Sequence, residues 1–487
     1  MLIRAIRPAD QPLLAELFRR LTPQSMQFRF LHAKGSLTSR ELDALVDLDF
    51  DARIGLAAVH REDGRDAIVG IAHCFRSDES GDAPRAEFAV IVAEEHHGRG
   101  IGTALLEHLA RLARAQGIQE FEALVLAGNA DMLKVFAESG FTVRQTAEAG
   151  VFHLVFPIRE TESFLHATMA RERHAAAESV RVFFEPRSVT VIGVSRHEGT
   201  IGRTIVENLV RCGFRAPIYP VNPAAQEIAG LRCHPSVAAV GAPIDLAIVV
   251  VPAAQVEKVV ADCASAGVRG VVVISSGFAE VSAEGRAAQD RLRRFVRSAG
   301  LRLVGPNCMG VLNTDPAVAL NATFAPTWPP AGNVSILSQS GALGLAMLER
   351  AQGLNIGIAG FVSVGNKADV SSNDLLSYWV DDPRTAVIAL YLESFGNPRK
   401  FARLAPEVAR RKPVVAVKSG RSAAGTRAAS SHSAALASLD VGVDALFAQA
   451  GVIRTGTLEE LFDVVALLST QPVPQGSRIG VVTNAGG

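Results

Sequence analysis

The chain has 487 residues, of which 48% are hydrophobic and 20% are charged. At roughly 150 residues per domain this length predicts about three domains, and the apolar content excludes a wholly disordered chain. Lys and Arg together number 49, as do Asp and Glu. This balance argues against a dedicated nucleic-acid-binding protein, which needs a basic face.

The chain carries no signal for a membrane span or for secretion. Its longest apolar runs, such as 246–251, are far shorter than the ~20 residues that cross a bilayer, and residues 1–11 lack the apolar core of a signal peptide. The five cysteines are scattered and form no C-x-x-C pair. We therefore expect a cytoplasmic protein without disulfides and without a metal site.

Residues 1–157 predict a first module with a compact α+β fold. Its strands are expected at 2–6, 54–60, 67–75, 86–93, 121–126 and 151–156, and its helices at 8–20, 102–116 and 130–139. The polar, alanine-rich residues that follow predict a helical linker over 158–182.

Two further modules, 183–320 and 331–472, alternate near-continuous apolar strands with helices, which is typical of parallel, doubly wound sheets. The strands are expected at 188–194, 218–221, 246–251, 271–275 and 302–304, then at 334–337, 356–364, 385–392 and 413–418. Residues 473–487 hold one more expected strand, 478–483, and a glycine turn, as at the start of a further domain that is cut short.

A glycine-rich loop, His97-Gly98-Arg99-Gly100-Ile101-Gly102, lies between an expected strand and an expected helix. Glycines leave the backbone N–H groups unshielded, and the helix N-terminus adds positive potential, so the loop suits a pyrophosphate. A plain strand-to-helix turn is the alternative. Asn129 and the pair Gly140-Phe141 follow at fitting distances.

With this loop and its companions the chain resembles the GNAT acyltransferases over roughly residues 1–157. The resemblance implies that residues 97–102 and Asn129 bind acetyl-CoA. His97 departs from the family, which usually has Gln or Arg there. Residues 21–30 and 47–51 further resemble the start of bacterial protein lysine acetyltransferases, in which a GNAT domain is fused to an ADP-forming acyl-CoA synthetase-like region.

Glu87 is the candidate general base of this module, because its strand leads toward the loop and its apolar neighbours favour a raised pKa. In the resembled enzymes a glutamate at this position deprotonates the acceptor lysine. A surface carboxylate is the alternative. The module has no tyrosine to protonate the leaving thiolate, and Phe136 occupies that neighbourhood. A CoA thiol with a pKa near ~8.5 leaves largely unaided.

The second module opens with 191–195 followed by Gly199 and Gly202, but no acidic ribose-binding residue follows about 20 positions later. Asn222 stands there instead. The pattern resembles the Rossmann-like CoA-binding domain of NDP-forming acyl-CoA synthetases and of succinyl-CoA synthetase. The resemblance implies that Ser195, Asn222 and Pro252 line CoA. A similar sheet that has lost its ligand is the alternative.

The third module resembles the flavodoxin-like domain of the same synthetases at 338–341, 391–393 and 429–433. Ser338, Ser340 and Gly341 begin a helix that offers N–H groups to an anion. In the resembled family a histidine at the His432 position carries phosphate, and a glutamate at the Glu393 position holds its imidazole. A relic of this site is the alternative.

The main hypothesis is therefore a transferase that moves an acetyl group from acetyl-CoA to a protein lysine, for example on an AMP-forming acyl-CoA synthetase. The alternative is the CoA-binding part of an ADP-forming acetate or acyl-CoA ligase that acts through a phosphohistidine. That activity needs ATP or ADP on an ATP-grasp domain from elsewhere, since we expect none in this chain. A CoA sensor without turnover is the third hypothesis, and self-association is an alternative to a monomer.

Overall fold

The computed structural model describes residues 1–62, 65–77, 84–419, 440–472, 474, 476–478 and 480–483. The chain divides into two compact units, Met1–Glu172 and Arg173–Gly487, which are considered separately. Helix α6, Glu162–Arg181, contains the boundary and occupies the expected linker. Among the helices of the described residues, none combines the length and the apolar character that a bilayer span requires.

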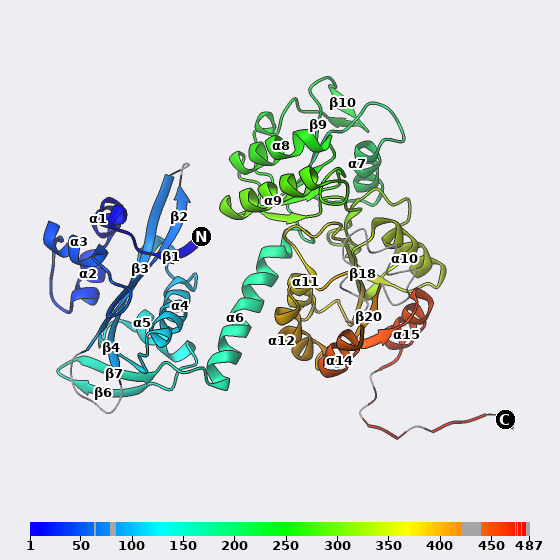
Figure 1. Ribbon diagram of the computed structural model, residues 1–487. Coiled ribbons are helices and arrows are strands. Elements are labelled where there is room, and N and C mark those ends of the chain that lie inside the picture. The colour runs from blue at the N-terminus through cyan, green and yellow to red at the C-terminus, as the bar shows by residue number, and fades with distance from the viewer. Residues whose placement is uncertain are drawn as a thin grey trace. The chain divides into compact units, whose positions relative to one another are not determined.

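The first unit is built on a seven-stranded sheet in the order β1-β2-β3-β4-β5-β7-β6 (Figure 1). Neighbouring strands are antiparallel except β4 and β5, which are parallel. The strands are β1 Leu2–Ala5, β2 Arg53–Glu62, β3 Arg65–Arg76, β4 Arg85–Val92, β5 Glu120–Leu126, β6 Arg144–Glu148 and β7 Val151–Pro157. The helices are α1 Gln11–Arg20, α2 Pro23–Phe30, α3 Ser39–Val46, α4 Ile101–Ala115 and α5 Ala130–Glu138.

Alternation along the strands divides the apolar side chains of this sheet between two cores. Ala57 packs with Leu14 of α1 and Leu45 of α3, whereas Ala58, its neighbour in β2, packs with Leu105 of α4. Both faces of the sheet are therefore covered by helices. The sequence predicted the sheet strands except β6, whose five residues are all exposed and carry no apolar alternation.

The second unit contains a five-stranded parallel sheet and a seven-stranded sheet that is parallel except at one edge, where two strand pairings are antiparallel. The first has the order β14-β13-β12-β8-β9, with strands β8 Val189–Ile192, β9 Ile218–Val221, β12 Leu246–Val249, β13 Gly270–Val273 and β14 Arg302–Val304. Its helices are α7 Ile201–Arg211, α8 Ala253–Ser265 and α9 Ala283–Ser298, and a short hairpin pairs β10 Glu227–Ile228 with β11 Leu231–Arg232.

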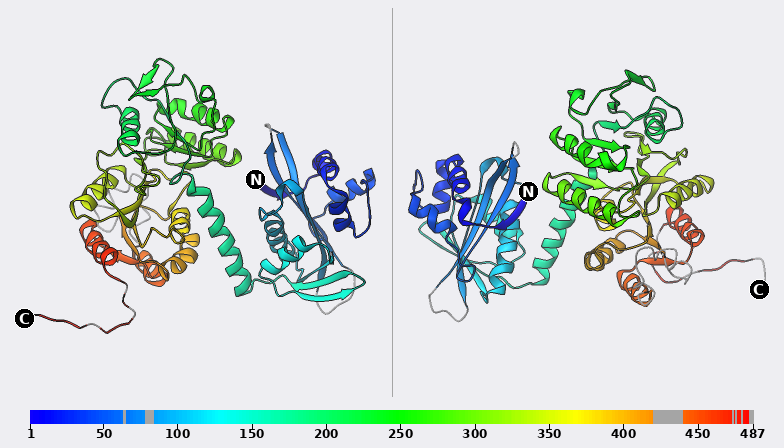
Figure 2. Two further views of the ribbon diagram at one scale, coloured as in Figure 1. Left: turned by 180° about the vertical axis from the view of Figure 1, so that it is seen from behind. Right: turned by 45° about the horizontal axis from the view of Figure 1, so that its top comes forward.

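The second sheet of this unit has the order β16-β15-β18-β17-β19-β20-β21, and Figure 2 shows it from two further sides. The strands are β15 Gly310–Asn313, β16 Leu320–Thr323, β17 Ala331–Ser338, β18 Ile358–Ser363, β19 Val387–Leu392, β20 Val414–Lys418 and β21 Ile453–Thr455. The described helices are α10 Gly341–Gly353, α11 Ser372–Trp379, α12 Pro398–Ala409, α14 Asp440–Ala450 and α15 Leu458–Thr470.

The antiparallel strands β15 and β16 were not predicted. β15 pairs with β18 and therefore joins the second sheet, although residues 310–313 precede the expected end of the second module at 320. Both strands are four residues long, and such short apolar segments give little periodicity. The predicted strand over 478–483 is wrong for the described part, since residues 480–483 form no strand and are exposed.

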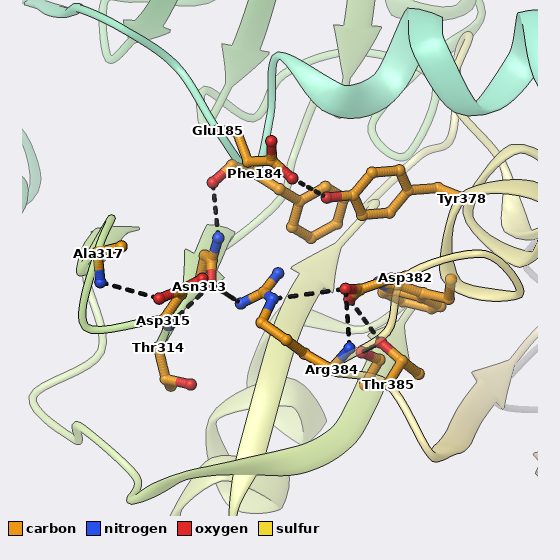
Figure 3. A network of polar contacts seen from close by, with 12 residues as sticks. Phe184, Glu185, Asn313, Thr314, Asp315, Ala317, Tyr378, Asp382, Arg384 and Thr385 are labelled. Atoms are coloured by element: carbon orange, nitrogen blue, oxygen red, sulfur yellow. Dashed lines mark hydrogen bonds and ion pairs between the residues drawn. The ribbon is translucent and has the colours of Figure 1, made fainter.

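A buried polar network ties β15 to the start of the unit (Figure 3). Asn313 is fully buried, and its Nδ2 donates to Phe184 O at 2.8 Å. Its Oδ1 accepts from Asp315 N at 2.9 Å and from Arg384 Nη1 at 2.6 Å. The Asn313 side chain thus connects the segment that follows α6, strand β15 and the loop before β19. Tyr378 closes the network by donating to Glu185 Oε1 at 2.7 Å.

Replacing Asn313 with Ala should destabilise the second unit by about 2 to 3 kcal/mol, because the Phe184 carbonyl keeps its burial and loses its donor. Urea unfolding followed by tryptophan fluorescence measures this, since both tryptophans, Trp328 and Trp379, lie in that unit. Asn333→Ala is the control. It removes one hydrogen bond, to Ser469 O, and should cost about 1 kcal/mol. Equal losses in the two variants would contradict the network's role.

Candidate functional sites

The parallel strands β4 and β5 form a fork in the first unit. They pair only at Arg85, Ala86 and Glu87, opposite residues 120–122, while β4 runs on to Val92 and β5 to Leu126. The pairing ends at Glu87 and Glu122, which lie side by side. Beyond them the backbone groups that face the fork are left for another partner.

The glycine-rich loop follows one arm of this fork. Gly98 and Gly100 have φ values of +71° and +73°, which glycine adopts without strain, and no atom lies within 4 Å of where a Cβ would stand on either. Gly100 is the N-cap of α4, so the first N–H groups of this helix lack intrahelical acceptors. The loop thus presents free donors on an open side, as a phosphate requires.

Two side chains of the expected set hold this region together. His97 Nε2 lies 2.9 Å from Val92 O at the end of β4. Asn129 follows the other arm, and its Oδ1 accepts from Met132 N at 3.1 Å, which caps α5. The structure therefore brings Glu87, residues 97–102 and Asn129 to one fork.

The surroundings of Glu87 differ from the sequence-based expectation. Its side chain is exposed rather than set in an apolar pocket, because it points away from the core that holds Ala86 and Phe88. A cationic residue near it is Arg29 of α2. Burial lowers the pKa of Arg29 to about 10, and the negative charge of Glu87 opposes that shift. The sequence predicted no role for Arg29.

His73 of β3 lies close enough to Arg29 to be influenced by its charge, and its side chain is fully buried. Burial lowers its pKa to about 4, the charge of Arg29 adds to this, and Leu45 O, 3.0 Å from Nε2, opposes it. Among the described atoms, neither His73 Nδ1 nor Arg29 Nε has a hydrogen-bond partner. The imidazole is therefore neutral at pH 7, and the positive charge here belongs to Arg29.

Because the folded state disfavours protonation of His73, the unfolded state binds more protons between pH 6.5 and 4, and the stability of the first unit falls as the pH falls through this range. The loss should reach about 3 kcal/mol at pH 4. His73→Gln keeps a donor for Leu45 O and should remove this part of the acid dependence. Urea unfolding followed by circular dichroism at pH 7, 5 and 4 measures it. An unchanged acid dependence in the variant would contradict the assignment.

In the second unit, the first parallel sheet gathers the expected CoA residues at its carboxyl edge. Ser195, Asn222 and Pro252 follow β8, β9 and β12, which are adjacent strands. The strand order reverses beside β8, which is where open α/β sheets bind ligands. A Cβ on Gly193 would lie 2.3 Å from Val250 O, so the turns after β8 and β12 touch.

Asn222 has a structural task at this edge. Its Nδ2 donates to Val194 O at 2.5 Å and its Oδ1 accepts from Ala224 N at 2.7 Å. These bonds fix the turn after β8 that carries Ser195. The amide therefore shapes the edge, and Ser195 and Pro252 are the side chains beside it that remain half-buried or exposed.

The second parallel sheet of this unit has its own reversal beside β17. Ser338 ends β17, and Ser340 caps α10, its Oγ accepting from Leu343 N at 3.4 Å. Glu393 directly follows the neighbouring strand β19 and is exposed. The structure thus places Ser338, Ser340, Gly341 and Glu393 together. His432 lies outside the described residues.

Two residues of this edge were not predicted. Gln339 Oε1 accepts from the backbone N of Glu393 at 2.7 Å and of Ser394 at 2.9 Å, which fixes the turn after β19. Lys367, after β18, donates to Ser394 O at 2.8 Å. The Ser-Gln-Ser-Gly run pointed to Gln339, but nothing local marks Lys367, because its partner is far away in the sequence.

The carboxyl edges of the two parallel sheets meet. Asn366, after β18, donates from Nδ2 to Glu280 Oε2 and accepts at Oδ1 from Asn307 Nδ2 at 3.3 Å. Glu280 follows β13 and Asn307 follows β14 of the other sheet. Glu280 Oε1 also accepts from Gly277 N at 2.6 Å and from Phe278 N at 3.1 Å. The two edges therefore form one continuous region.

Three family models match the chain. Residues 23–141 match the acetyltransferase (GNAT) family, residues 187–314 a CoA binding domain, and residues 331–468 a succinyl-CoA ligase like flavodoxin domain. These matches confirm the predicted fold class of a GNAT domain followed by two α/β domains.

Relatives match the two parts separately. The ADP-forming acetate–CoA ligase of Methanocaldococcus jannaschii is 45% identical over 302 residues, which are 62% of this chain and 42% of the relative. The alpha subunit of ADP-forming acetate–CoA ligase I of Pyrococcus furiosus is 42% identical over 63% of this chain and 67% of the subunit. An acetyltransferase of Pseudomonas aeruginosa is 30% identical over 141 residues, 29% of this chain and 74% of that protein.

Among solved structures, a dinucleotide forming acetyl-coenzyme A synthetase 1 of Ca. Korarchaeum cryptofilum, in complex with phosphate and ADP, is 41% identical, with a TM-score of 0.58, over 61% of this chain and 64% of that one. The chain thus spans between 42% and 67% of the length of these ligase relatives. These relatives support the alternative hypothesis, the CoA-binding part of an ADP-forming ligase, better than the main hypothesis of a lysine acetyltransferase.

Proposed function

The chain belongs to the family of ADP-forming acetate–CoA ligases, with a GNAT domain beside the matched region, and from this we propose that its second unit carries out the nucleotide-free half of such a ligase reaction. The observation that carries the proposal is the meeting of the two carboxyl edges. It supports the proposal because the CoA residues are expected at the carboxyl edge of one sheet and the phosphate residues at that of the other, and Asn366 joins the two edges. None of the three matched families is a nucleotide-binding domain, so ADP or ATP would enter on a further domain.

The proposed half-reaction has two steps. An oxygen of inorganic phosphate attacks the thioester carbonyl of acetyl-CoA, an O–C bond forms, the C–S bond breaks, and the thiolate leaves and takes up a proton. His432 then attacks phosphorus of the acetyl phosphate, an N–P bond forms, the P–O bond to the acetyl group breaks, and acetate leaves from the phosphohistidine. The N-terminus of α10 at Ser340 and Gly341 offsets the phosphate charge, and the Glu393 carboxylate fixes the imidazole tautomer.

The test incubates the purified chain with acetyl-CoA and ³²P-phosphate in the absence of nucleotide. The wild type should release CoA thiol and acquire an acid-labile, alkali-stable label. His432→Asn should lose the label, and Glu393→Gln should lower it about 10- to 100-fold, as expected for a residue that orients an imidazole.

His174→Asn, which changes an exposed histidine of α6, is the matched control and should keep the full label. An unlabelled wild type, or a label that persists in His432→Asn, would overturn the ligase proposal.

A second function is favoured by the fork in the first unit. We propose that residues 97–102 and Asn129 bind acetyl-CoA, and that Glu87 takes a proton from a protein lysine that then attacks the thioester. Glu87 stands at the last paired position of β4, so it lies where the fork opens. Its exposure supports proton exchange with solvent. An AMP-forming acyl-CoA synthetase is the first acceptor to try.

Glu87→Gln should lower acetyl transfer at least about 100-fold, since a general base contributes this much, and should leave the affinity for acetyl-CoA unchanged. The measurement is mass spectrometry of new acetyl-lysines in a bacterial lysate supplied with acetyl-CoA but no ATP. The assay is run in the His432→Asn background, so that only the first unit contributes.

Glu122→Gln is the matched control, because Glu122 lies opposite Glu87 at the same register position. Loss of transfer in this control alone would assign the base to Glu122. Binding of acetyl-CoA with no turnover in either assay would favour the CoA sensor.

A further inference from the structure

Lys367 occupies an unusual backbone position at the meeting of the two edges. It lies in the turn after β18, and its φ of +56° is in the left-handed region, which lysine rarely adopts. The turn is held from outside: a Cβ on Gly365 would lie 2.2 Å from Asn307 O, and Asn366 is bound to Glu280. Surrounding contacts therefore maintain a costly conformation, as is common at functional positions.

The side chain of Lys367 crosses the end of a neighbouring strand. Nζ donates to Ser394 O at 2.8 Å and to Ser394 Oγ at 2.6 Å, and Ser394 follows β19. In the sheet, β17 lies between β18 and β19. The Lys367 side chain reaches from the turn after β18 to the turn after β19. It therefore passes over the carboxyl end of β17, where α10 begins. Among the described residues, Ser394 engages two of the three donors of this ammonium group.

Two charged groups act on this ammonium group. Glu393 and Lys418 are the groups that influence Lys367 electrostatically. Lys418 ends β20, is 9% exposed, and donates to Ser419 O at 2.7 Å. Burial lowers the pKa of Lys367 to about 8, and Glu393 opposes that shift.

Packing alone does not account for an ammonium group that is held by two hydrogen bonds to Ser394. A partly buried ammonium group is stabilised when an anion binds to it. Gln339, just before the N-terminus of α10, also donates from Nε2 to Ser394 O at 2.7 Å, so Lys367 Nζ and the start of this helix meet at one carbonyl group. Helix dipole, ammonium and a nearby hydroxyl form a donor set suited to a tetrahedral dianion.

We propose that Lys367 binds the phosphoryl oxygens, first of inorganic phosphate and then of the acyl phosphate, over the carboxyl end of β17. This inference rests on the proposed ligase function of the second unit and adds a substrate-binding residue to it. Because Asn366 bonds to Glu280, the turn that carries Lys367 is fixed to the CoA-binding sheet, so phosphate would be held in reach of the thioester.

The first experiment measures the binding of inorganic phosphate to the full chain by calorimetry. Lys367→Gln should lose one phosphate site per chain, or weaken it at least tenfold. Lys367→Arg keeps the charge and should stay within about threefold of the wild type.

Lys412→Gln is the matched control. Lys412 is also partly buried and donates to Trp379 O at 2.7 Å and Asp382 O at 2.5 Å, but it lies just before β20 at the opposite edge of the sheet. Melting curves of all variants check that the second unit is folded. Wild-type phosphate binding by Lys367→Gln would overturn the proposal, as would a loss of binding in Lys412→Gln equal to that in Lys367→Gln.

The second measurement separates this proposal from the ligase function. It records the dependence of CoA release from acetyl-CoA on phosphate concentration. If the wild type releases CoA and Lys367→Gln has the same KM for phosphate, the ligase function stands and the role of Lys367 fails. If phosphate binding depends on Lys367 but no CoA is released, the site stands and the ligase function fails.

Discussion

The contact between the carboxyl edges of the two parallel sheets is the constraint on which the second unit depends. Parallel strands point all their carboxyl ends one way, so each sheet offers a single edge for ligands. Asn366 joins these edges through Glu280 and Asn307. The loops that follow β13, β14 and β18 therefore lie side by side at this contact.

The apolar core of this unit maintains that contact. One continuous cluster of buried side chains includes Val191 of the first sheet, Val311 of β15 and Leu390 of the second. The hairpin β15–β16 extends the second sheet, and Asn313 connects it to the start of the unit. The two domains thus share their interior, and their relative position follows from packing rather than from a flexible linker.

The sheet of the first unit opens between two of its own strands. Its sheet is antiparallel except for β4 and β5, and this one parallel pair separates beyond Glu87 and Glu122. Separation exposes backbone groups in the middle of a sheet, where a ligand can complete them. The glycine-rich loop and the α4 N-terminus stand at the end of one arm. Both units therefore place a helix N-terminus close to the end of a strand.

The sequence by itself determined most strands and helices, because apolar periodicity and glycine positions are local. It also placed the loop at 97–102 and the run at 338–341, since a strand, a turn and a helix start within a few residues of one another. Tertiary structure decided the exposure of Glu87, its proximity to Arg29, and the reach of Lys367 to Ser394. These depend on strand pairing and burial between residues far apart in the chain, which local patterns do not encode.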